Sequence, residues 1–536
     1  MKNIKTYSIL IIASLSWLGC SNFDDLNTNP NTSATIDPEI MLTTIEFLPG
    51  ANWQDQTRYF YYPGGFMNQW TGLWGMVEYG GNAQKSAPEM SRLWLKYYPD
   101  VINKTITLID ATKDDPALVN INSMARIIKV QCFLRLTDYY GDIPYFDAGK
   151  GYLEDKLITQ YDRQEDIYND FFKELDEASK ALDASKPLAK YDAIYDSDIN
   201  EWKKYANSLR LRIAMRLVKV NPAKAKQEAE TAVAAGVFTS NEDICAVTYE
   251  DFRNPSTGIG KGNGVANLIY GSSADRGSEF WLTTEIVEVM EAMNDPRLLN
   301  GYYATIQLRD ENRTDVTDLV LNERGGPYAA STMQAQRYAW DPNSKYPGGP
   351  VTINYNGEEV AIEYRYSLLR ASKYIQAFDA PFINIGYAEV EFLLAEAAFR
   401  GWNVPGSAAE HYKNGLEASV RQWRIFGAEV NESDVTAFSN ANPLTPGQEL
   451  MDINTQLWVL HILDPMEAWS NYRRSGMPEV TFHNYVPSLN QSNGQMPRRM
   501  EYPSQEAELN TSSYEEAVSR IGEDDWLKRV WWDVEQ

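Results

Sequence analysis

The sequence has 536 residues and a formal charge of −25, with 74 acidic against 49 basic side chains. Nucleic acids and anionic membrane surfaces bind proteins through basic patches, so this balance argues against both as partners. Only three cysteines are present, which excludes a small scaffold built on disulfides.

The N-terminus has the three parts of a secretory signal. Two lysines supply positive charge, residues 8–18 form an apolar core, and Gly19 is a small residue directly before Cys20. The core is far shorter than the ~20 residues that a spanning helix needs. We therefore expect a signal peptide at residues 1–19, and lipidation at Cys20 at the start of a tether over residues 20–40. An ordinary signal peptide with an incidental cysteine is the alternative.

Beyond the tether, several segments repeat apolar residues at helical spacing. One such run extends from Trp202 to Leu217, after which Asn221, Pro222 and Gly236 mark the start and end of a second helix. We expect a single domain over residues 41–536 that is mainly α. Its helical pairs are predicted near residues 104–146, 160–183, 200–236 and 384–424.

The last of these pairs shows how the helices are delimited. Ser407 and Glu410 form a capping box at the start of its second helix. Alanine-rich faces at such spacing are typical of tetratricopeptide-like pairs, although the period is not constant. Cys132 lies in an apolar helical pattern, which favours a buried thiol over a disulfide with the distant Cys245.

Irregular, aromatic-rich segments separate the helical pairs, near residues 50–98, 250–283 and 300–370. A hairpin with Asn356 and Gly357 at its turn is the clear exception. Loops held on a rigid scaffold commonly carry binding sites. The predicted architecture is therefore a helical scaffold with a loop-rich ligand-binding face.

The first candidate ligand site is "FMNQWTGLWGMVEYGGNAQ". Trp70 and Trp74 are followed by Tyr79 and Asn82, and aromatic rings beside amide groups suit the apolar faces and hydroxyl edges of sugars. The alternative is that both tryptophans anchor this segment in the core.

The second candidate is "NERGGPYAASTMQAQRYAWDPNSKYPGG". Its glycines and prolines predict a loop, in which Arg324 can donate hydrogen bonds and Tyr328 and Trp340 can stack on a ligand. Trp281 in "GSEFW" is a further candidate, with a core position as its alternative.

No catalytic or metal-binding constellation stands out. His411, His461 and His483 occur singly, and neither a nucleophile elbow nor a phosphate-binding loop is present. Asp196 and Asp198 offer oxygen ligands, but the rest of a calcium loop is missing, so a helix cap is favoured and calcium stays unsupported. We predict no cofactor, no metal and no enzymatic activity.

Seven motifs in order give the chain a resemblance to the SusD/RagB family of outer-membrane lipoproteins, in particular to its SusD-like branch. The motifs are "CSNFDDLNTNPN", "RLTDYYGDIPYFDA", "DINEWKKYANSLRLRIAMRL", "NDPRL", "YAEVEFLLAEAAFRGW", "NYRRSGMPEV" and "MPRRMEYPSQEAELN". We expect most of their residues to have structural roles, and Arg473 and Arg474 to make ion pairs or to cap carbonyls.

The resemblance implies a surface-exposed lipoprotein, anchored in the outer membrane, that captures oligosaccharides without cleaving them. It implies delivery to a SusC-like TonB-dependent transporter in polysaccharide utilisation. A peptide- or protein-binding lipoprotein of the same fold is the alternative. A hydrolase is the weakest reading, because the sequence singles out no carboxylate pair.

Overall fold

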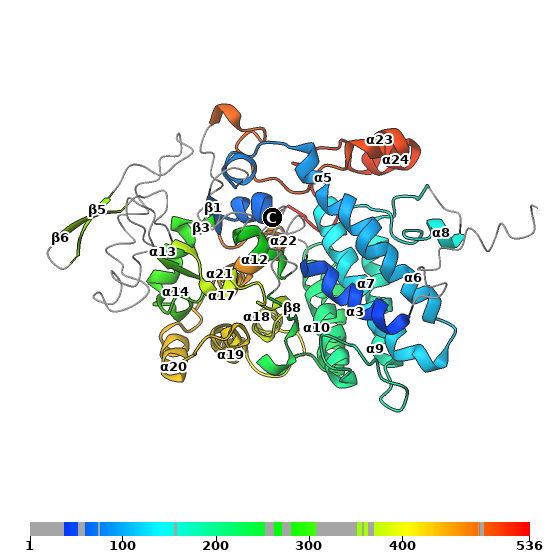
Figure 1. The fold of residues 1–536 in the computed structure, drawn as a ribbon, viewed down its shortest axis with the longest axis horizontal. Helices are drawn as coiled ribbons and strands as arrows, with labels where there is room; N and C mark the ends of the chain where they lie inside the picture. The colour runs from blue at the N-terminus through cyan, green and yellow to red at the C-terminus, as the bar shows by residue number, and fades with distance from the viewer. Residues whose placement is uncertain are drawn as a thin grey trace, which may run out of the picture.

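The structure is a computed structural model of the chain. It describes residues 37–51, 59–72, 76–154, 158–251, 262–270, 280–306, 351–355, 358–362, 369–480, 482 and 487–535. Helices form most of the described chain and are arranged in two adjoining groups, with a small sheet and a hairpin at one end (Figure 1).

The first group of helices comes from the N-terminal half. It contains α3 (Pro38–Ala51), α6 (Asn103–Thr112), α7 (Val119–Tyr140), α9 (Gln164–Ala181), α10 (Ile199–Arg216) and α11 (Pro222–Ala235). α7 packs on α6 and α9, and α10 packs on α9 and α11. The pairs predicted near 104–146 and 200–236 are present. The segment 160–183 instead holds the single helix α9, since Gln164 to Ala181 contains no glycine or proline to interrupt it.

Local signals fix the ends of these helices. The Asp198 carboxylate accepts hydrogen bonds from the backbone of Asn200 and Glu201 at 2.8 and 3.3 Å, which confirms a helix-capping role. Asn221 caps α11 by accepting from Lys224 N at 3.2 Å. Gly141 ends α7 with φ 92°, a left-handed conformation that favours glycine.

The second group comes from the C-terminal half. It contains α18 (Tyr387–Phe399), α19 (Ala408–Arg421), α20 (Glu432–Ala441), α21 (Glu449–Leu460) and α22 (Pro465–Ser475). The predicted capping box is present, because Ser407 and Glu410 exchange hydrogen bonds between side chain and backbone. A Cβ at Gly415 of α19 would lie 2.6 Å from the Phe392 ring of α18, so glycine permits close packing of this pair.

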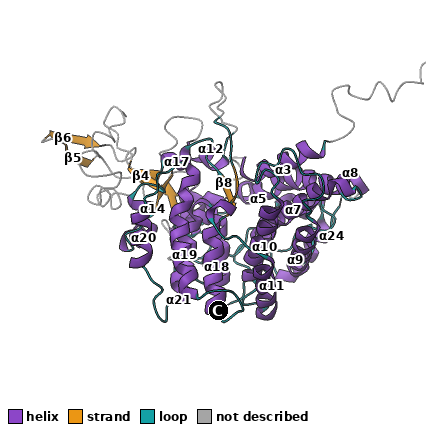
Figure 2. Ribbon diagram, turned by 90° about the horizontal axis from the view of Figure 1, so that it is seen from below, coloured by secondary structure: helices purple, strands orange, loops and turns teal. Residues whose placement is uncertain are grey.

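The two groups meet where α10 packs against α18. Viewed from below, α19, α18, α10 and α9 succeed one another across the molecule (Figure 2). The contact is not purely apolar, since Arg212 of α10 binds both carboxylate oxygens of Glu389 of α18 at 2.6 Å. The scaffold is therefore one continuous helical layer.

Shorter helices complete the scaffold. The α-helices are α5 (Ala87–Lys96), α8 (Gly151–Glu154), α12 (Gly264–Tyr270), α13 (Thr284–Ala292), α14 (Pro296–Leu299), α17 (Lys373–Gln376), α23 (Ser504–Leu509) and α24 (Thr511–Ile521). The π-helical segments are η1 (Phe60–Gly64), η2 (Met76–Gly81) and η3 (Tyr97–Ile102). The 3-10 segments are η4 (Pro116–Leu118), η5 (Asn241–Asp243), η8 (Gln422–Phe426), η9 (His461–Leu463) and η10 (Pro487–Leu489).

Strands are few and short. β1 (Trp70–Gly72), β3 (Phe280–Leu282), β7 (Leu369–Ala371) and β4 (Ala304–Ile306) form an antiparallel sheet in that order. β2 (Cys245–Val247) pairs with β8 (Phe382–Ile385). β5 (Val351–Tyr355) pairs with β6 (Glu358–Ile362), which confirms the predicted hairpin, while Asn356 and Gly357 lie outside the described residues.

The core holds most of the described tryptophans together with paired charges. Among the largest fully buried side chains are Trp70, Trp202, Trp423, Trp469, Trp526 and Trp532. Arg474 binds Glu396 through two hydrogen bonds, and Arg473 donates to the Arg498 carbonyl at 2.9 Å, so both arginines have the expected structural roles. Cys132 and Cys245 are both buried free thiols in the described part of the chain.

His411 also has a structural role. Its Nδ1 lies 2.7 Å from Glu391 Oε2, and its Nε2 contacts the Pro405 carbonyl. Burial alone would lower the pKa of His411, but the hydrogen bonds with Glu391 and the Pro405 carbonyl, together with the charges of Glu391 and Glu410, outweigh it and the pKa is raised. The side chain thus ties α19 to α18.

Candidate ligand-binding site

The small four-stranded sheet borders both segments that the sequence singles out. β1 ends at Gly72, two residues before Trp74, and β4 ends at Ile306, upstream of Arg324, Tyr328 and Trp340. Trp74 and the latter three lie outside the described residues, and so does Cys20. The site is therefore built from the strands and from the described neighbours of β1.

Trp70 is part of the core. It is 1% exposed, and its indole N–H donates to the Ile462 carbonyl at 2.7 Å. Its ring also packs against Phe60 at a centroid distance of 5.8 Å. Both ring faces are covered by protein, so the structure gives Trp70 the anchoring role that was the alternative to ligand binding.

Tyr79 and Asn82 follow β1. Tyr79 belongs to η2, which packs on β1, and its ring lies 5.9 Å from Tyr61 and 5.5 Å from Tyr62. It is half-buried, whereas Asn82 is 2% exposed. Of the two, Tyr79 retains surface that a ligand can reach.

Trp281 occupies the second strand of the sheet. It is directly opposite Thr71 of β1 and directly opposite Arg370 of β7. Arg370 in turn is opposite Thr305 of β4. These four positions form one row across the sheet, which we call the sheet row.

One face of the small sheet belongs to the core. Since side chains alternate along a strand, the residues next to the sheet row belong to the opposite face from the row. That opposite face is core, because Trp70, Leu282, Ala371 and Ala304 are each at most 5% exposed. In the sheet row, the side chain of Thr71 is described, and it is 7% exposed. Arg370 was missed by sequence reasoning, because nothing local predicts its pairing with a strand almost 90 residues away.

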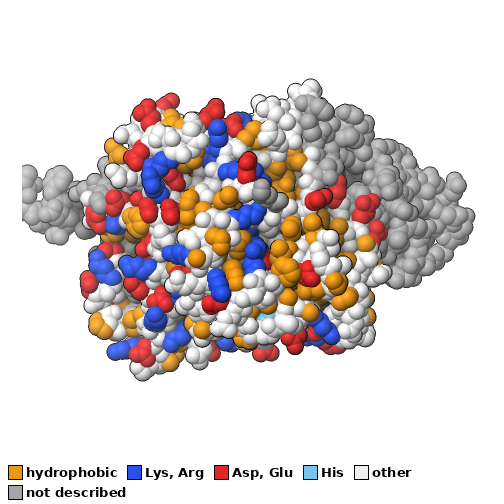
Figure 3. All heavy atoms as spheres, turned by 180° about the vertical axis from the view of Figure 1, so that it is seen from behind, with side chains coloured by type: hydrophobic (Ala, Val, Ile, Leu, Met, Phe, Trp, Pro, Cys, Tyr) orange, Lys and Arg blue, Asp and Glu red, His pale blue; other side chains and the backbone are white. Residues whose placement is uncertain are grey.

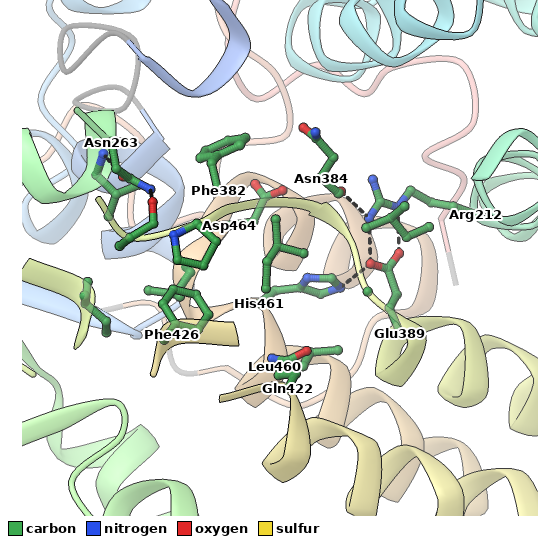
Figure 4. Close-up of a pocket in the computed structure, with 18 residues that line it drawn as sticks. Arg212, Asn263, Phe382, Asn384, Glu389, Gln422, Phe426, Leu460, His461 and Asp464 are labelled. Atoms are coloured by element: carbon green, nitrogen blue, oxygen red, sulfur yellow. Dashed lines mark hydrogen bonds and ion pairs between the residues drawn. The ribbon is translucent and has the colours of Figure 1, made fainter. Parts of the chain in front are cut away.

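A separate cavity lies between β8, α18 and η9. Figure 4 shows His461 near its centre, with Asn263 and Phe426 on one side and Arg212 with Glu389 on the other. Its volume is about 60 Å³. A water molecule takes ~30 Å³ in the liquid and a cavity that binds benzene has ~150 Å³. The cavity is suited to a few water molecules and is too small for a sugar ring.

Buried ion pairs line this cavity, and further ion pairs lie next to it in the core. Arg135 binds Asp464 at 3.0 and 2.7 Å, and Arg216 contacts Glu467. Burial alone would raise the pKa of Glu467, but Arg216 and Arg212 outweigh it and hold the pKa well below its ordinary value. The group is a charge-balanced network that ties α7 and α10 to α22 and η9.

Ligand atoms of Glu389, His461 and Glu467 lie within 4.8 Å of one another, which is a spacing that a metal ion can use. Guanidinium groups of Arg212 and Arg216 are already bound to the two carboxylates at this place. A divalent cation there would be repelled by both, and the two carboxylates are already neutralised. The chemistry of this cluster fits structural ion pairing rather than a metal centre.

A larger hollow of about 600 Å³ lies between the ends of α7 and α24, the start of α9 and the C-terminal segment. Two of the arginines that line it are paired within the fold, since Arg499 binds Asp524 at 2.6 Å and Arg520 binds Asp142 at 2.5 Å. The face opposite to that of Figure 1 shows a short stripe of Lys and Arg side chains beside apolar ones (Figure 3). We take the sheet row as the candidate ligand site, because it borders both aromatic-rich segments that the sequence singles out.

Comparison with known proteins identifies the family. Residues 66–503 match the SusD-like family profile described as "Starch-binding associating with outer membrane". The chain belongs to the SusD-like family. A comparison with curated protein sequences gives no match.

Solved SusD-like structures resemble this chain over almost its whole length. One, described as a chitin-binding protein, is 33% identical, covers 93% of this chain and 100% of its own, and has a TM-score of 0.76. A Bacteroidetes SusD-like protein is 28% identical, with the same coverage and TM-score. A chitin-binding SusD homologue from Flavobacterium johnsoniae is 24% identical, covers 92% of this chain and 98% of its own, and has a TM-score of 0.65, which shows the shared fold.

These matches confirm the expected SusD-like architecture of mainly α structure with tetratricopeptide-like pairs. No helix in the described part of the chain is long and apolar enough to cross a membrane. The motif residues that indicated the SusD-like family are mostly structural here, as Arg473, Arg474 and Tyr140 show.

Proposed function

We propose that the protein is a cell-surface lipoprotein that captures oligosaccharides and delivers them to a SusC-like TonB-dependent transporter in the outer membrane, without catalysis. The observation that carries the proposal is the 33% identity, over 93% of this chain, with a structure described as a chitin-binding protein. Chitin oligosaccharides are therefore the first ligand class to test.

The sheet row supplies the proposed site. Tryptophan rings stack on the apolar faces of sugars, while arginine and threonine pair with the polar groups at the ring edges. The row combines Trp281 with Arg370 and two threonines at the border of the aromatic-rich segments. Trp74, Tyr79, Arg324, Tyr328 and Trp340 are proposed to complete the site from those segments.

Lipid attachment at Cys20 is proposed to hold the protein at the membrane. The predicted tether over residues 20–40 would connect Cys20 to the scaffold, whose first described helix, α3, begins at Pro38. Cys20→Ala is expected to release the protein from the membrane fraction without changing its fold, and retention of this variant in the membrane would contradict the anchor.

Calorimetry tests ligand capture. The full-length chain in detergent is titrated with chitin oligosaccharides, with other polysaccharides and with a peptide digest. Trp281→Ala, Trp74→Ala and Trp340→Ala are each expected to weaken glycan binding while the melting temperature is retained. Trp402→Ala is the matched control, because this half-buried tryptophan follows α18 on the helical side. The next residue, Asn403, donates its backbone N–H to Glu230 of α11.

The same titration separates the competing functions. Heat from peptides and none from glycans would assign the protein to the peptide-binding class. Release of shorter sugars during the titration would point to a hydrolase. Co-purification with a large outer-membrane barrel protein from cells that express the lipidated chain is expected for the transporter partner.

A further inference from the structure

We infer that the hollow at the start of α9 binds oligosaccharides whose sugars carry a carboxylate, at a place separate from the sheet row. The hollow has a volume of about 600 Å³ and lies among chain segments that are far apart in the sequence. Pockets for small ligands have volumes of ~300–1,000 Å³, so the hollow is large enough for a short oligosaccharide. The inference is carried by the arginines that line the hollow and by the half-buried side chain of Trp531.

The lining of the hollow has more positive than negative side chains. Its charged residues are Arg163, Arg499, Arg520 and Arg529 on the positive side and Asp142 and Glu165 on the negative side. This local excess of positive charge stands out, because the whole chain has a formal charge of −25. Charges of one sign that line a concave site attract ligands of the opposite sign. The lining therefore favours a ligand that carries negative charge.

Two of the four arginines retain donors for a ligand. Arg163 is exposed, and its guanidinium has no hydrogen bond or ion pair with a described residue. Arg529 donates to Asp533 at 2.8 Å, and its second carboxylate neighbour, Glu535, is 3.7 Å away. Asp533 also accepts a hydrogen bond from Arg498 at 2.7 Å, so one carboxylate serves two arginines. Since a guanidinium has five N–H donors, Arg163 and Arg529 can each bind a carboxylate of a ligand.

The other two arginines hold the walls of the hollow in place. Arg499 donates to the Tyr140 carbonyl at 3.0 Å and to Asp524 at 2.6 Å. Arg520 of α24 donates to Asp142, which follows α7, at 2.5 Å. These contacts join the C-terminal segments to the end of α7, so the hollow is formed by the fold itself. A site that is already formed loses less free energy on binding than one that has to be ordered first.

Two buried polar atoms of lining residues lack a partner. Gln164 and Arg499 are 0% and 1% exposed. Gln164 Oε1 and Arg499 Nη2 have no hydrogen-bond partner among the described residues. Buried polar groups are almost always paired, either with protein or with water. A ligand hydroxyl or an ordered water molecule at the base of the hollow can pair with either atom, since a hydroxyl donates to the amide oxygen and accepts from the guanidinium.

Trp531 makes the hollow suited to a sugar acid rather than to a bare anion. It lines the hollow, and its ring lies 5.8 Å from the ring of Tyr168 in α9, which fixes its position. Aromatic rings pack on the apolar C–H faces of sugars. A uronic acid presents such a face together with a carboxylate, so Trp531 and the two available arginines match both of its parts.

The test compares two forms of one oligosaccharide. Trigalacturonic acid carries a carboxylate on each ring, and its trimethyl ester has the same rings and linkages without the charges. Triglutamate is a third probe, since it offers carboxylates without sugar rings. Calorimetry with the full-length chain in detergent gives the dissociation constants for wild type, Arg163→Gln, Arg529→Gln and Trp531→Ala. Arg424→Gln is the matched control, because Arg424 is also exposed but pairs with Glu432, outside the hollow.

Wild type is expected to bind trigalacturonic acid at least ten-fold more tightly than the ester, and more tightly than triglutamate. Arg163→Gln and Arg529→Gln are each expected to lower the ratio of acid to ester affinity several-fold, and Trp531→Ala is expected to weaken both sugars. Arg163→Gln should melt at the temperature of wild type, because its guanidinium has no partner among the described residues. Equal binding of acid and ester by wild type, an unchanged ratio in Arg163→Gln, or tighter binding of triglutamate would overturn the inference.

Chitohexaose separates this inference from the proposed function. It carries no carboxylate and its proposed site is the sheet row, so Arg163→Gln is expected to leave its affinity within two-fold of wild type. Loss of chitohexaose binding in Arg163→Gln would place both ligands in the hollow and overturn a separate site. Wild type that binds trigalacturonic acid but not chitohexaose would support the hollow and contradict chitin oligosaccharides as the ligand class.

Discussion

Glu396→Gln tests the buried ion pair that joins α18 to α22. Arg474 donates to the two Glu396 oxygens at 3.0 and 2.8 Å, and the two side chains are 1% and 0% exposed. Removing one partner of a buried pair leaves an uncompensated charge and costs ~3–5 kcal/mol. A folded domain has only ~5–15 kcal/mol of net stability, so the loss is large.

The pH dependence follows from the same pair. Burial alone would raise the pKa of Glu396, but Arg474 and Arg400 outweigh it and lower the pKa from 4.5 to about 2. This drop corresponds to ~3 kcal/mol of stability. Because the folded pKa is below the unfolded one, that stability is present above pH 4.5 and is lost as the pH falls towards 2.

Urea unfolding, monitored by tryptophan fluorescence, measures these losses of stability. Glu396→Gln is expected to lower the midpoint at pH 7, and its stability is expected to fall less than that of wild type between pH 5 and pH 2. Glu396→Gln with Arg474→Met is expected to recover most of the loss, since neither charge is then left unpaired. Glu432→Gln, which affects an exposed carboxylate with arginine partners, should cost at most ~1 kcal/mol. A loss below ~1 kcal/mol for Glu396→Gln would show that this buried ion pair contributes little to stability.

Three further variants test other parts of the structure. Trp70→Phe leaves the Ile462 carbonyl without its donor and is expected to lower the free energy of unfolding, measured in urea, by ~1–3 kcal/mol. Its glycan affinity is expected to equal that of wild type. Weaker glycan binding would indicate that Trp70 contacts the ligand. Gly415→Ala crowds the Phe392 ring and should lower the free energy of unfolding by ~1–3 kcal/mol. A free energy of unfolding equal to that of wild type would show that α18 and α19 can separate. Burial and the charge of Asp192 raise the pKa of Glu46 to about 10, so wild type loses stability as the pH rises from 4.5 towards 10. Glu46→Gln should therefore be more stable than wild type at pH 8 and lose this advantage at pH 5. A difference in unfolding free energy between the two proteins that does not change with pH would contradict a neutral Glu46.

The helices could be predicted because their signals are local. The Ser407 capping box, the Asn221 cap and the Gly141 helix end each depend on residues within one turn. The expectation of a helical pair at 160–183 was wrong, because the spacing of apolar residues does not show whether a segment holds one helix or two. The hairpin of β5 and β6 was equally predictable, since its two strands are adjacent in the sequence.

The candidate site could be predicted only in part. Trp281 was identified as an aromatic residue in a glycine- and serine-containing segment, but its neighbours Thr71 and Arg370 come from strands about 210 and 90 residues away. Each strand of this sheet has three residues, which is too short to show a period. Trp70 and Trp74 looked alike in the sequence, and only tertiary packing shows that Trp70 is buried against η9.

Calorimetry of the full-length chain with chitin oligosaccharides and, separately, with a peptide digest decides between glycan capture and peptide capture. We expect heat with the chitin oligosaccharides that is lost in Trp281→Ala and kept in Trp402→Ala, and no heat with peptides. Heat with peptides together with silence across the glycans would contradict glycan capture.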